Sequence, residues 1–431
     1  MAVAREDSRG SFAAVTLPAP EVDPLASAAS LGAAISVHFE RPSDGISVIG
    51  AGVLAEERAD RGAEALELLA RLADPARIGF RGGDPRPPGP WFGGLAFDLA
   101  ASPGALWEGF PPSRWVLPRV LLWRRAGEVH LTGFAAPSQG PELERELQGI
   151  RERLASRPPP RAAPAARSAR SDRPAWDGLV AAALAAIRGG AMKKVVLARP
   201  IDVTSDRAID PLAVASALCR AAPSCTTFAI AGQKGGAFVG ATPELLCRIC
   251  AGTVETMALG GSGNGGAGAE SWATDKELRE HAAIVDFISQ ALRPHCESLE
   301  VPAHPRVREL PQVAHLETDI RGALVPGKGP AEVVRALHPT PAVGGVPRER
   351  ALSFLREHEG LDRGWYAGAV GWVGPGAAEL CVALRCALVR GSRARIFVGA
   401  GIVEGSDAAA EWAETDAKAS VVLGALGGAR G

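Results

Sequence analysis

The sequence predicts an α+β fold for this chain of 431 residues. Short apolar runs bounded by glycine and proline indicate strands, and amphipathic stretches between them indicate helices. Because helices and strands are grouped rather than strictly alternating, an α+β arrangement is favoured over a doubly wound parallel sheet. Hydrophobic residues make up 47% of the chain and charged residues 22%, which is a globular composition with enough apolar surface for a sizeable core.

Charge and cysteine content argue against several classes of protein. The 47 basic and 48 acidic residues give a net charge of −1, which disfavours a nucleic-acid-binding protein that depends on a basic field. Seven cysteines at irregular spacing form no disulfide framework, so a reducing compartment is the simpler interpretation. The first residues lack the apolar stretch of a signal peptide, and the longest apolar run, 179–187, is about half a membrane span. We therefore expect a cytoplasmic protein with no membrane partner.

Residues 156–175 are rich in proline, alanine, arginine and serine and show no apolar period. Three consecutive prolines favour an extended conformation, and the arginines repel one another. We interpret this stretch as an exposed linker or long loop between an N-terminal portion, 1–155, and a C-terminal region, 176–426.

The N-terminal portion consists mostly of short predicted strands. They are expected at 34–39, 45–53, 91–97, 116–123 and 129–134. A helix is expected over 56–73, because Leu66 and Leu69 lie at helical spacing. His38 and Asp98 are isolated polar residues of the kind that is usually structural, so we assign no chemistry to this portion.

The C-terminal region carries denser signals. Strands are expected at 194–199, 227–230, 237–239, 245–250, 253–259, 367–373, 379–388 and 395–398. Helices are expected at 176–188, at 275–292, and from an N-cap at Ser406 or Asp407 to about Leu426. The apolar positions of the 275–292 helix, at helical spacing, are Leu278, Val285, Ile288 and Leu292.

Two of these helices each present a pair of carboxylates. Glu277 and Glu280 are three residues apart on one, and Glu411 and Glu414 on the other, with Lys418 four residues further on. Residues at this spacing share a helix face, so each pair points in one direction. Four converging carboxylates would repel one another unless a hard cation lay between them, and Mg²⁺ suits such oxygen ligands. The alternative is two solvated helix faces.

Two further residues are candidates for acid–base chemistry. Lys194 begins an apolar strand, and a lysine that faces a pocket can lose its proton and act as a general base. Glu244 follows a Gly/Pro turn, and a carboxyl in a partly apolar site can stay protonated and act as a general acid. Taken alone, each residue is a weak signal, because a lysine at the end of a strand is usually exposed.

Two motifs do not indicate a cofactor. GSGNGG at 261–266 matches the glycine pattern of dinucleotide-binding loops, but the next helix begins about nine residues later and no βαβ unit follows. Cys247 and Cys250 form a single CxxC pair on an apolar strand, with no second pair at zinc spacing. We interpret them as buried structural thiols.

Several segments of the C-terminal region match a known family in the same order. They are KVVLAR (194–199), FVGATPELL (238–246), KELREH (276–281), HLETDIRG (315–322), LHPTPAVGG (337–345), RGWYAGAVGW (363–372), VALR (382–385), GAGIVEGSD (399–407) and EWAETDAK (411–418). The region resembles the chorismate-utilising enzymes, most closely the isochorismate synthases. ERP at 40–42 and FGGLAFD at 92–98 are similar to the family's N-terminal portion. The resemblance implies a single large domain of two packed β-sheets flanked by helices, to which 1–155 also belongs.

The resemblance also implies a role for each matching residue. Lys194 would be the base that activates water, and Glu244 the acid that protonates the leaving C4 hydroxyl. The ligands of Mg²⁺ would be Glu280 and Glu414, with Glu277, Glu411 and Lys418 close to the metal. The substrate-binding residues would be His315, Thr340, Ala342, Tyr366, Arg385, Gly399 and Gly401.

Three positions distinguish the branches of this family. Gly260 stands where the covalent-lysine branch, which makes aminodeoxychorismate, has lysine. Lys194 stands where anthranilate synthases, which depend on a glutaminase partner, usually have glutamine, and Ala342 where salicylate synthases tend to have threonine. The resemblance therefore implies an isomerase, an isochorismate synthase of menaquinone or siderophore biosynthesis, with chorismate as substrate and no glutaminase subunit. The alternatives are a salicylate or anthranilate synthase and, outside enzymes, a non-catalytic binding protein on the same fold.

Overall fold

The computed structural model describes residues 11–80, 85–101, 103–154, 166–264, 275–310 and 313–427. The strands are β1 (Phe12–Pro18), β2 (Ile35–Arg41), β3 (Ile46–Ala51), β4 (Ala55–Ala59), β5 (Ile78–Phe80), β6 (Trp91–Leu95), β7 (Ser113–Leu117), β8 (Val120–Arg125), β9 (Glu128–Ala135), β10 (Ala166–Arg170), β11 (Lys194–Ser205), β12 (Thr226–Ala231), β13 (Ala237–Thr242), β14 (Leu245–Cys250), β15 (Thr253–Asn264), β16 (Cys296–Glu300), β17 (Arg306–Glu309), β18 (Val313–Leu324), β19 (Gly345–Val346), β20 (Ala369–Gly374), β21 (Ala377–Val382), β22 (Cys386–Arg390) and β23 (Arg393–Val403). The helices are α1 (Gly62–Leu72), α2 (Gly140–Leu154), α3 (Arg173–Arg188), α4 (Pro211–Ala221), α5 (Asp275–Leu292), α6 (Pro330–Leu337), α7 (Arg348–His358) and α8 (Ala408–Ala425).

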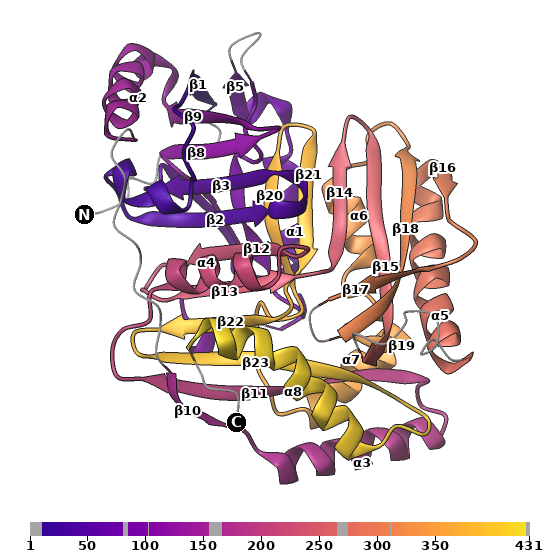
Figure 1. The fold of residues 1–431 in the computed structure, drawn as a ribbon. Coiled ribbons are helices and arrows are strands. Elements are labelled where there is room, and N and C mark those ends of the chain that lie inside the picture. Colours follow the sequence, from indigo (N-terminus) through magenta and orange to yellow (C-terminus); the bar gives the residue numbers. More distant parts are fainter. Residues whose placement is uncertain are drawn as a thin grey trace.

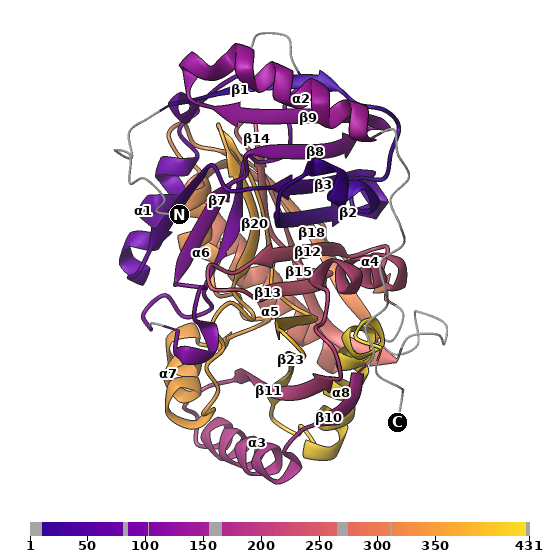
Figure 2. The same cartoon turned by 90° about the vertical axis from the view of Figure 1, so that its left-hand side faces the viewer.

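These strands form two large sheets (Figure 1). The larger sheet has the order β10-β11-β23-β22-β13-β12-β2-β3-β8-β9-β1-β5, with β19 also paired to β11. The smaller sheet has the order β16-β18-β15-β14-β21-β20-β6-β7-β4, with β17 also paired to β18. Figure 2 shows α2 at one end of the larger sheet and α3 at the other. The predicted α+β fold with two packed sheets and flanking helices is confirmed.

Both sheets combine strands from before and after the proline-rich stretch. In the larger sheet β12 pairs with β2, with Phe228 opposite Phe39, and in the smaller sheet β20 pairs with β6, with Trp372 opposite Phe92. Part of the stretch expected to be a linker is itself ordered structure, because β10 pairs with the edge of β11 and α3 begins at Arg173. Residues 155–165 lie outside the described residues.

The main core lies between the two sheets and is rich in large aromatic side chains. The ring centroids of Trp107 and Phe238 are 5.3 Å apart, and those of Phe110 and Trp365 are 5.2 Å apart, both in edge-to-face contact. Such pairs contribute about 0.5–1.5 kcal/mol beyond the burial of their area. A second core fills the space between the opposite face of the larger sheet and the helices α2, α4 and α8.

Two predicted strands are in fact passages between the sheets. The run 116–123 is divided after Leu117, where Pro118 cannot donate a ladder hydrogen bond, so β7 lies in the smaller sheet and β8 in the larger one. The run 379–388 is divided in the same way into β21 and β22. An apolar run does not reveal such a break, because both halves are buried.

Three smaller predictions were also wrong. The helix expected over 56–73 begins only at Gly62, because the first of these residues belong to β4. Leu278 is 42% exposed, and the buried face of α5 is formed instead by His281, Ile284, Ile288 and Leu292. The thiol of Cys247 is buried as expected, whereas Cys250, at the end of β14, is exposed.

The helices α5 and α8 agree with the sequence. The side chain of Asp407 accepts hydrogen bonds from the backbone N–H groups of Ala409 and Ala410, so Asp407 and not Ser406 is the N-cap of α8. Four helices, α2, α4, α6 and α7, were not predicted. Among the described residues, no helix combines the length and the apolar character needed to cross a membrane.

Candidate active site

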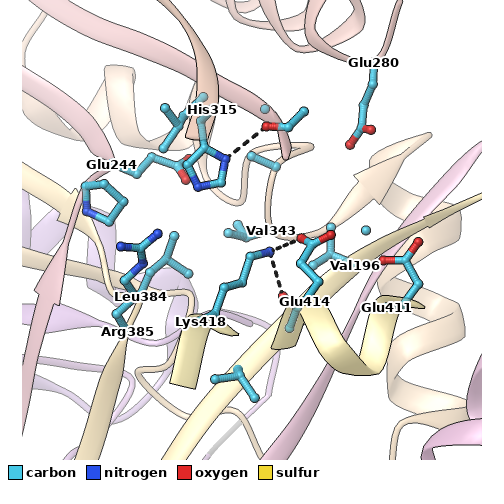
Figure 3. Close-up of a pocket in the computed structure, with 18 of the residues that line it drawn as sticks. Val196, Glu244, Glu280, His315, Val343, Leu384, Arg385, Glu411, Glu414 and Lys418 are labelled. Atoms are coloured by element: carbon cyan, nitrogen blue, oxygen red, sulfur yellow. Dashed lines mark hydrogen bonds and ion pairs between the residues drawn. The ribbon is translucent and has the colours of Figure 1, made fainter. Parts of the chain in front are cut away.

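The predicted site residues lie together around a cavity of about 160 Å³ (Figure 3). All of them except Thr340 line it: Lys194, Glu244, Glu277, Glu280, His315, Ala342, Tyr366, Arg385, Gly399, Gly401, Glu411, Glu414 and Lys418. Thr340 lies directly behind this wall, with its hydroxyl oriented as a donor to Oε1 of Glu244 at 3.5 Å. The two carboxylate-bearing helices therefore face a cavity and not solvent.

The cavity lies where the chain passes from one sheet to the other. Glu244 stands between β13 of the larger sheet and β14 of the smaller one, and Arg385 stands between β21 and β22 in the opposite direction. The backbone of Arg385 has a φ of 47°, in the left-handed region that a non-glycine residue adopts only at some cost. The N–H of Ala241 donates to the carbonyl of Arg385 at 3.2 Å and ties the two passages together.

Glu244 has the environment of a proton donor. Its side chain is only 4% exposed, and burial raises its pKa to about 7, against the opposing effects of Lys194, Thr340 and Lys418. A substantial fraction of this carboxyl is therefore protonated near neutral pH. A general acid needs such a pKa, close to the working pH.

Lys194 occupies the first position of β11 and is buried, whereas Lys193 beside it is exposed. Nζ of Lys194 donates to Oε1 of Glu280 at 2.5 Å. On the neighbouring strand β23, a Cβ at Gly401 would lie 3.0 Å from Cε of Lys194 and 3.5 Å from Oε1 of Glu280. Glycine at 401 thus leaves room for the lysine–carboxylate contact.

The carboxylates of the two helices converge on the cavity. In Figure 3, Glu280 of α5 points across it toward Glu411 and Glu414 of α8. Glu414 is paired with Nζ of Lys418 at 2.6 Å, and the same amine donates to the carbonyl of Gly399 at 3.1 Å. A set made only of carboxylate oxygens fits a hard divalent cation.

The opposite wall carries groups suited to an anion. Arg385 is buried, its pKa is lowered by burial, and no carboxylate of the described residues forms an ion pair with its guanidinium. Nδ1 of His315 donates to the carbonyl of Gly261 at 3.0 Å, and burial lowers the pKa of this histidine to about 3. His315 is therefore neutral, with an unprotonated Nε2. Burial raises the pKa of Tyr366, so its hydroxyl keeps its proton.

The apolar lining of the cavity and its support were not predicted. The additional apolar lining residues are Val196, Pro243, Leu259, Val343, Leu384, Phe397 and Val398. Behind them, the buried guanidinium of Arg363 donates to both oxygens of Glu359 at 2.6 Å and to the carbonyls of Val196 (2.6 Å) and Val343 (3.0 Å). Period-2 spacing along β11 could have identified Val196, but Glu359 and Arg363 carry no signal in a single sequence.

Replacing Arg363 by methionine is expected to lower the free energy of unfolding by about 3–5 kcal/mol, because Glu359 would be left as an uncompensated buried charge. Urea denaturation measures this change. The matched control is Arg395→Met, which breaks an exposed pair with Asp202 and should cost less than about 1 kcal/mol. Equal losses of unfolding free energy in the two variants would show that the buried pair contributes no more to stability than the exposed one.

Comparison with known proteins agrees with this geometry. The profile of the family described as "Chorismate binding enzyme" matches residues 1–427. The chain is 35% identical over 353 residues to isochorismate synthase MenF of Bacillus subtilis, covering 79% of this chain and 75% of that protein. It is 41% identical over 273 residues to the salicylate biosynthesis isochorismate synthase of Pseudomonas aeruginosa, covering 60% of this chain and 56% of that protein. The structure of MenF, the menaquinone-specific isochorismate synthase from Escherichia coli, superposes with a TM-score of 0.79 at 27% identity, covering 97% of this chain and 95% of that one.

Proposed function

Because this chain belongs to the family of chorismate-binding enzymes, we propose that it is a Mg²⁺-dependent isochorismate synthase. The observation that carries the proposal is a single cavity that contains a lysine, a buried carboxyl with a raised pKa, an arginine that pairs with no carboxylate of the described residues, and two pairs of glutamates. A pure binding protein would need neither the lysine nor the protonated carboxyl.

The charges of the cavity support a metal requirement. With Glu244 protonated, four carboxylates face three cationic side chains, those of Lys194, Arg385 and Lys418. Chorismate would add two more carboxylates, and Lys194 must give up its own charge to act as a base. When bound, Mg²⁺ would supply positive charge that neutralises these groups, with Glu280 and Glu414 as ligands and Glu277 and Glu411 close by.

Lys194 and Glu244 supply the two proton transfers that the isomerisation needs. Neutral Lys194 takes a proton from water, whose oxygen forms the new bond to C2 of chorismate while the ring double bonds shift. The bond from C4 to its hydroxyl breaks, and Glu244 protonates that oxygen as it leaves as water. One water is gained and one lost, and transfer of a proton from Lys194 back to Glu244 resets the enzyme. Each such group contributes about 10²–10⁴-fold to the rate.

Arg385 would hold one substrate carboxylate. Its planar guanidinium can form two parallel hydrogen bonds, and its burial strengthens the interaction with an anion. Tyr366 and the backbone at Gly399 and Gly401 line the same cavity and would complete the substrate site, with His315, Thr340 and Ala342.

Two positions support isochorismate as the end product. Gly260 offers no amine for covalent chemistry, and a Cβ there would meet Cδ1 of Ile284 at 2.4 Å. Ala342 stands in the cavity wall where salicylate synthases tend to carry threonine. We therefore propose a role in menaquinone or siderophore biosynthesis without a glutaminase subunit. The cysteines of the described residues are free, which supports a reducing, cytoplasmic location.

The proposal is tested by incubating the purified protein with chorismate, with and without Mg²⁺, and separating the products by liquid chromatography. A Mg²⁺-dependent isochorismate peak without pyruvate is expected. Salicylate with pyruvate would identify a salicylate synthase, and turnover only with added ammonia would identify an anthranilate synthase. No consumption under any of these conditions would favour a binding protein.

The carboxylates of α5 and α8 are expected to set the Mg²⁺ requirement. Glu280→Gln and Glu414→Gln each remove one charged oxygen ligand, so the Mg²⁺ concentration for half-maximal activity should rise at least about tenfold. Steady-state rates against Mg²⁺ concentration measure this shift. Asp286→Asn, on the exposed face of the same helix as Glu280, is the control and should change nothing. An unchanged Mg²⁺ dependence in both glutamine variants would contradict the assigned ligands.

A further inference from the structure

A second cluster of metal-ligating side chains lies away from the cavity. Nε2 of His38 is 3.5 Å from Oε2 of Glu40 and 3.9 Å from Sγ of Cys219, and the three ligand atoms all lie within 4.8 Å of one another. The side chain of His38 is fully buried, that of Glu40 is 12% exposed, and Cys219 is half-buried. His38, isolated in the sequence, therefore has two reactive neighbours in the fold.

The topology explains why these three side chains meet. His38 and Glu40 are two residues apart on β2, so they project from the same face of the strand. Val37 and Phe39, which alternate with them, belong to the core between the two sheets. The pair therefore points to the opposite face of the larger sheet, where α4 packs against β2, β12 and β13 and contributes Cys219.

The donor set and its spacing correspond to a transition-metal site. Zn²⁺ is bound by imidazole nitrogen and carboxylate oxygen at about 2.0–2.2 Å and by thiolate sulfur at about 2.3 Å. Tetrahedral coordination places such ligands about 3.3–3.7 Å from one another. The distances from Nε2 of His38 to its two neighbours, 3.5 and 3.9 Å, are at or slightly above this range.

We propose that His38, Glu40 and Cys219 form a structural Zn²⁺ site that fastens α4 to β2 on the outer face of the larger sheet. Water or the nearby carboxylate of Asp23 completes the coordination. The two elements joined by this site are separated by 181 positions in sequence at His38 and Cys219, so the metal closes a long loop. The site is independent of the catalytic cavity, whose lining contains none of these residues.

The electrostatics of the cluster agree with a cation. Burial raises the pKa of Glu40, and the carboxylate of Asp23 raises it further. The pKa of Cys219 is likewise raised by burial and by Glu40. The hydrogen bond with Cys219 acts in the opposite direction and lowers the pKa of Glu40. A bound divalent ion would favour the ionised form of both groups, which would then be anionic ligands.

The test uses the full-length protein, stripped of metal and held in excess Mg²⁺, and titrated with Co²⁺ as a spectroscopic substitute for Zn²⁺. A thiolate-to-cobalt charge-transfer band that saturates at one equivalent and is abolished by Zn²⁺ is expected. Cys219→Ala should remove the band, and His38→Ala should weaken Co²⁺ binding at least about tenfold. Cys250→Ser, which changes an exposed cysteine on β14, should leave the titration unchanged.

X-ray absorption of the wild-type protein loaded with one equivalent of Zn²⁺ gives a readout that needs no variant. One sulfur at about 2.3 Å with nitrogen and oxygen neighbours is expected. Zn²⁺ should also raise the melting temperature of the wild type but not that of Cys219→Ala. Isochorismate formation with Mg²⁺ should survive in Cys219→Ala. A zinc shell without sulfur, or a cobalt band that persists in Cys219→Ala, would overturn the proposal.

Discussion

Replacing Lys194 by alanine is expected to reduce chorismate turnover by at least about 10²–10⁴-fold while the protein remains folded. The reason is that the reaction needs a base for water, and Lys194 is the buried lysine at the start of β11 that faces the cavity together with Glu244. Single-turnover measurements at saturating Mg²⁺ separate this loss from any change in metal binding, which matters because Nζ of Lys194 contacts Glu280.

Lys193→Ala is the matched control. Its side chain is exposed and one residue away, so this variant should retain wild-type activity. Circular dichroism and thermal melting should be the same for both variants. If Lys194→Ala kept more than a tenth of the wild-type rate, the assignment of Lys194 as the base would fail.

Replacing Glu244 by glutamine is expected to cost about 10²–10⁴-fold in turnover, because glutamine preserves the shape of the side chain but cannot give up a proton. The pH dependence provides a second signature. Glu244 donates only when protonated, and its pKa is raised to about 7, so kcat/KM of the wild type should fall as pH rises through about 7. The residual activity of Glu244→Gln should lack this alkaline decrease. If Glu244→Gln showed the same decrease of kcat/KM above about pH 7, that decrease would have to come from another group.

The raised pKa of Glu244 should also make the free energy of unfolding depend on pH. Between the ordinary pKa of 4.5 and the raised value of about 7, the folded protein binds more protons at Glu244 than the unfolded chain does. Its contribution to stability is therefore complete below 4.5 and is lost as pH rises through about 7, to a total of about 3 kcal/mol at most. Chemical denaturation across this range should show a flatter profile for Glu244→Gln. Glu300→Gln, an exposed control on β16, should follow the wild type.

The sequence predicted local structure well where one face of an element is buried and its ends are marked. The strand 245–250 and the helix 275–292 match β14 and α5 in both bounds. The helix α4 was missed although Asp210 caps it and Pro211 begins it, a combination typical of a helix start. The apolar run of the 379–388 strand hid the break at Arg385, because a change of sheet leaves no mark on hydrophobicity.

The sequence predicted most of the polar residues that line the cavity, but not the contacts around them. Helical spacing shows that Glu277 and Glu280 share a face, but only the fold brings that face opposite Glu411. The contact between His38 and Cys219 was not predictable, because Cys219 is remote in sequence and belongs to a helix that was missed. Local patterns specify side-chain direction, whereas such encounters depend on the order of strands in the sheet.

The position of β23 has a consequence for synthesis on the ribosome. In the larger sheet β23 and β22 lie between β11 and β13, and in the described part of the chain the other neighbours of β11, which are β10 and β19, connect to no further strand of that sheet. A nascent chain that ends before residue 386 therefore holds Lys194 on a piece of sheet separate from the strand that leads to Glu244, with an edge of β11 open to other chains. Catalysis should begin only after release of the C-terminus. A chain stalled before β23 should be bound by chaperones and should not convert chorismate.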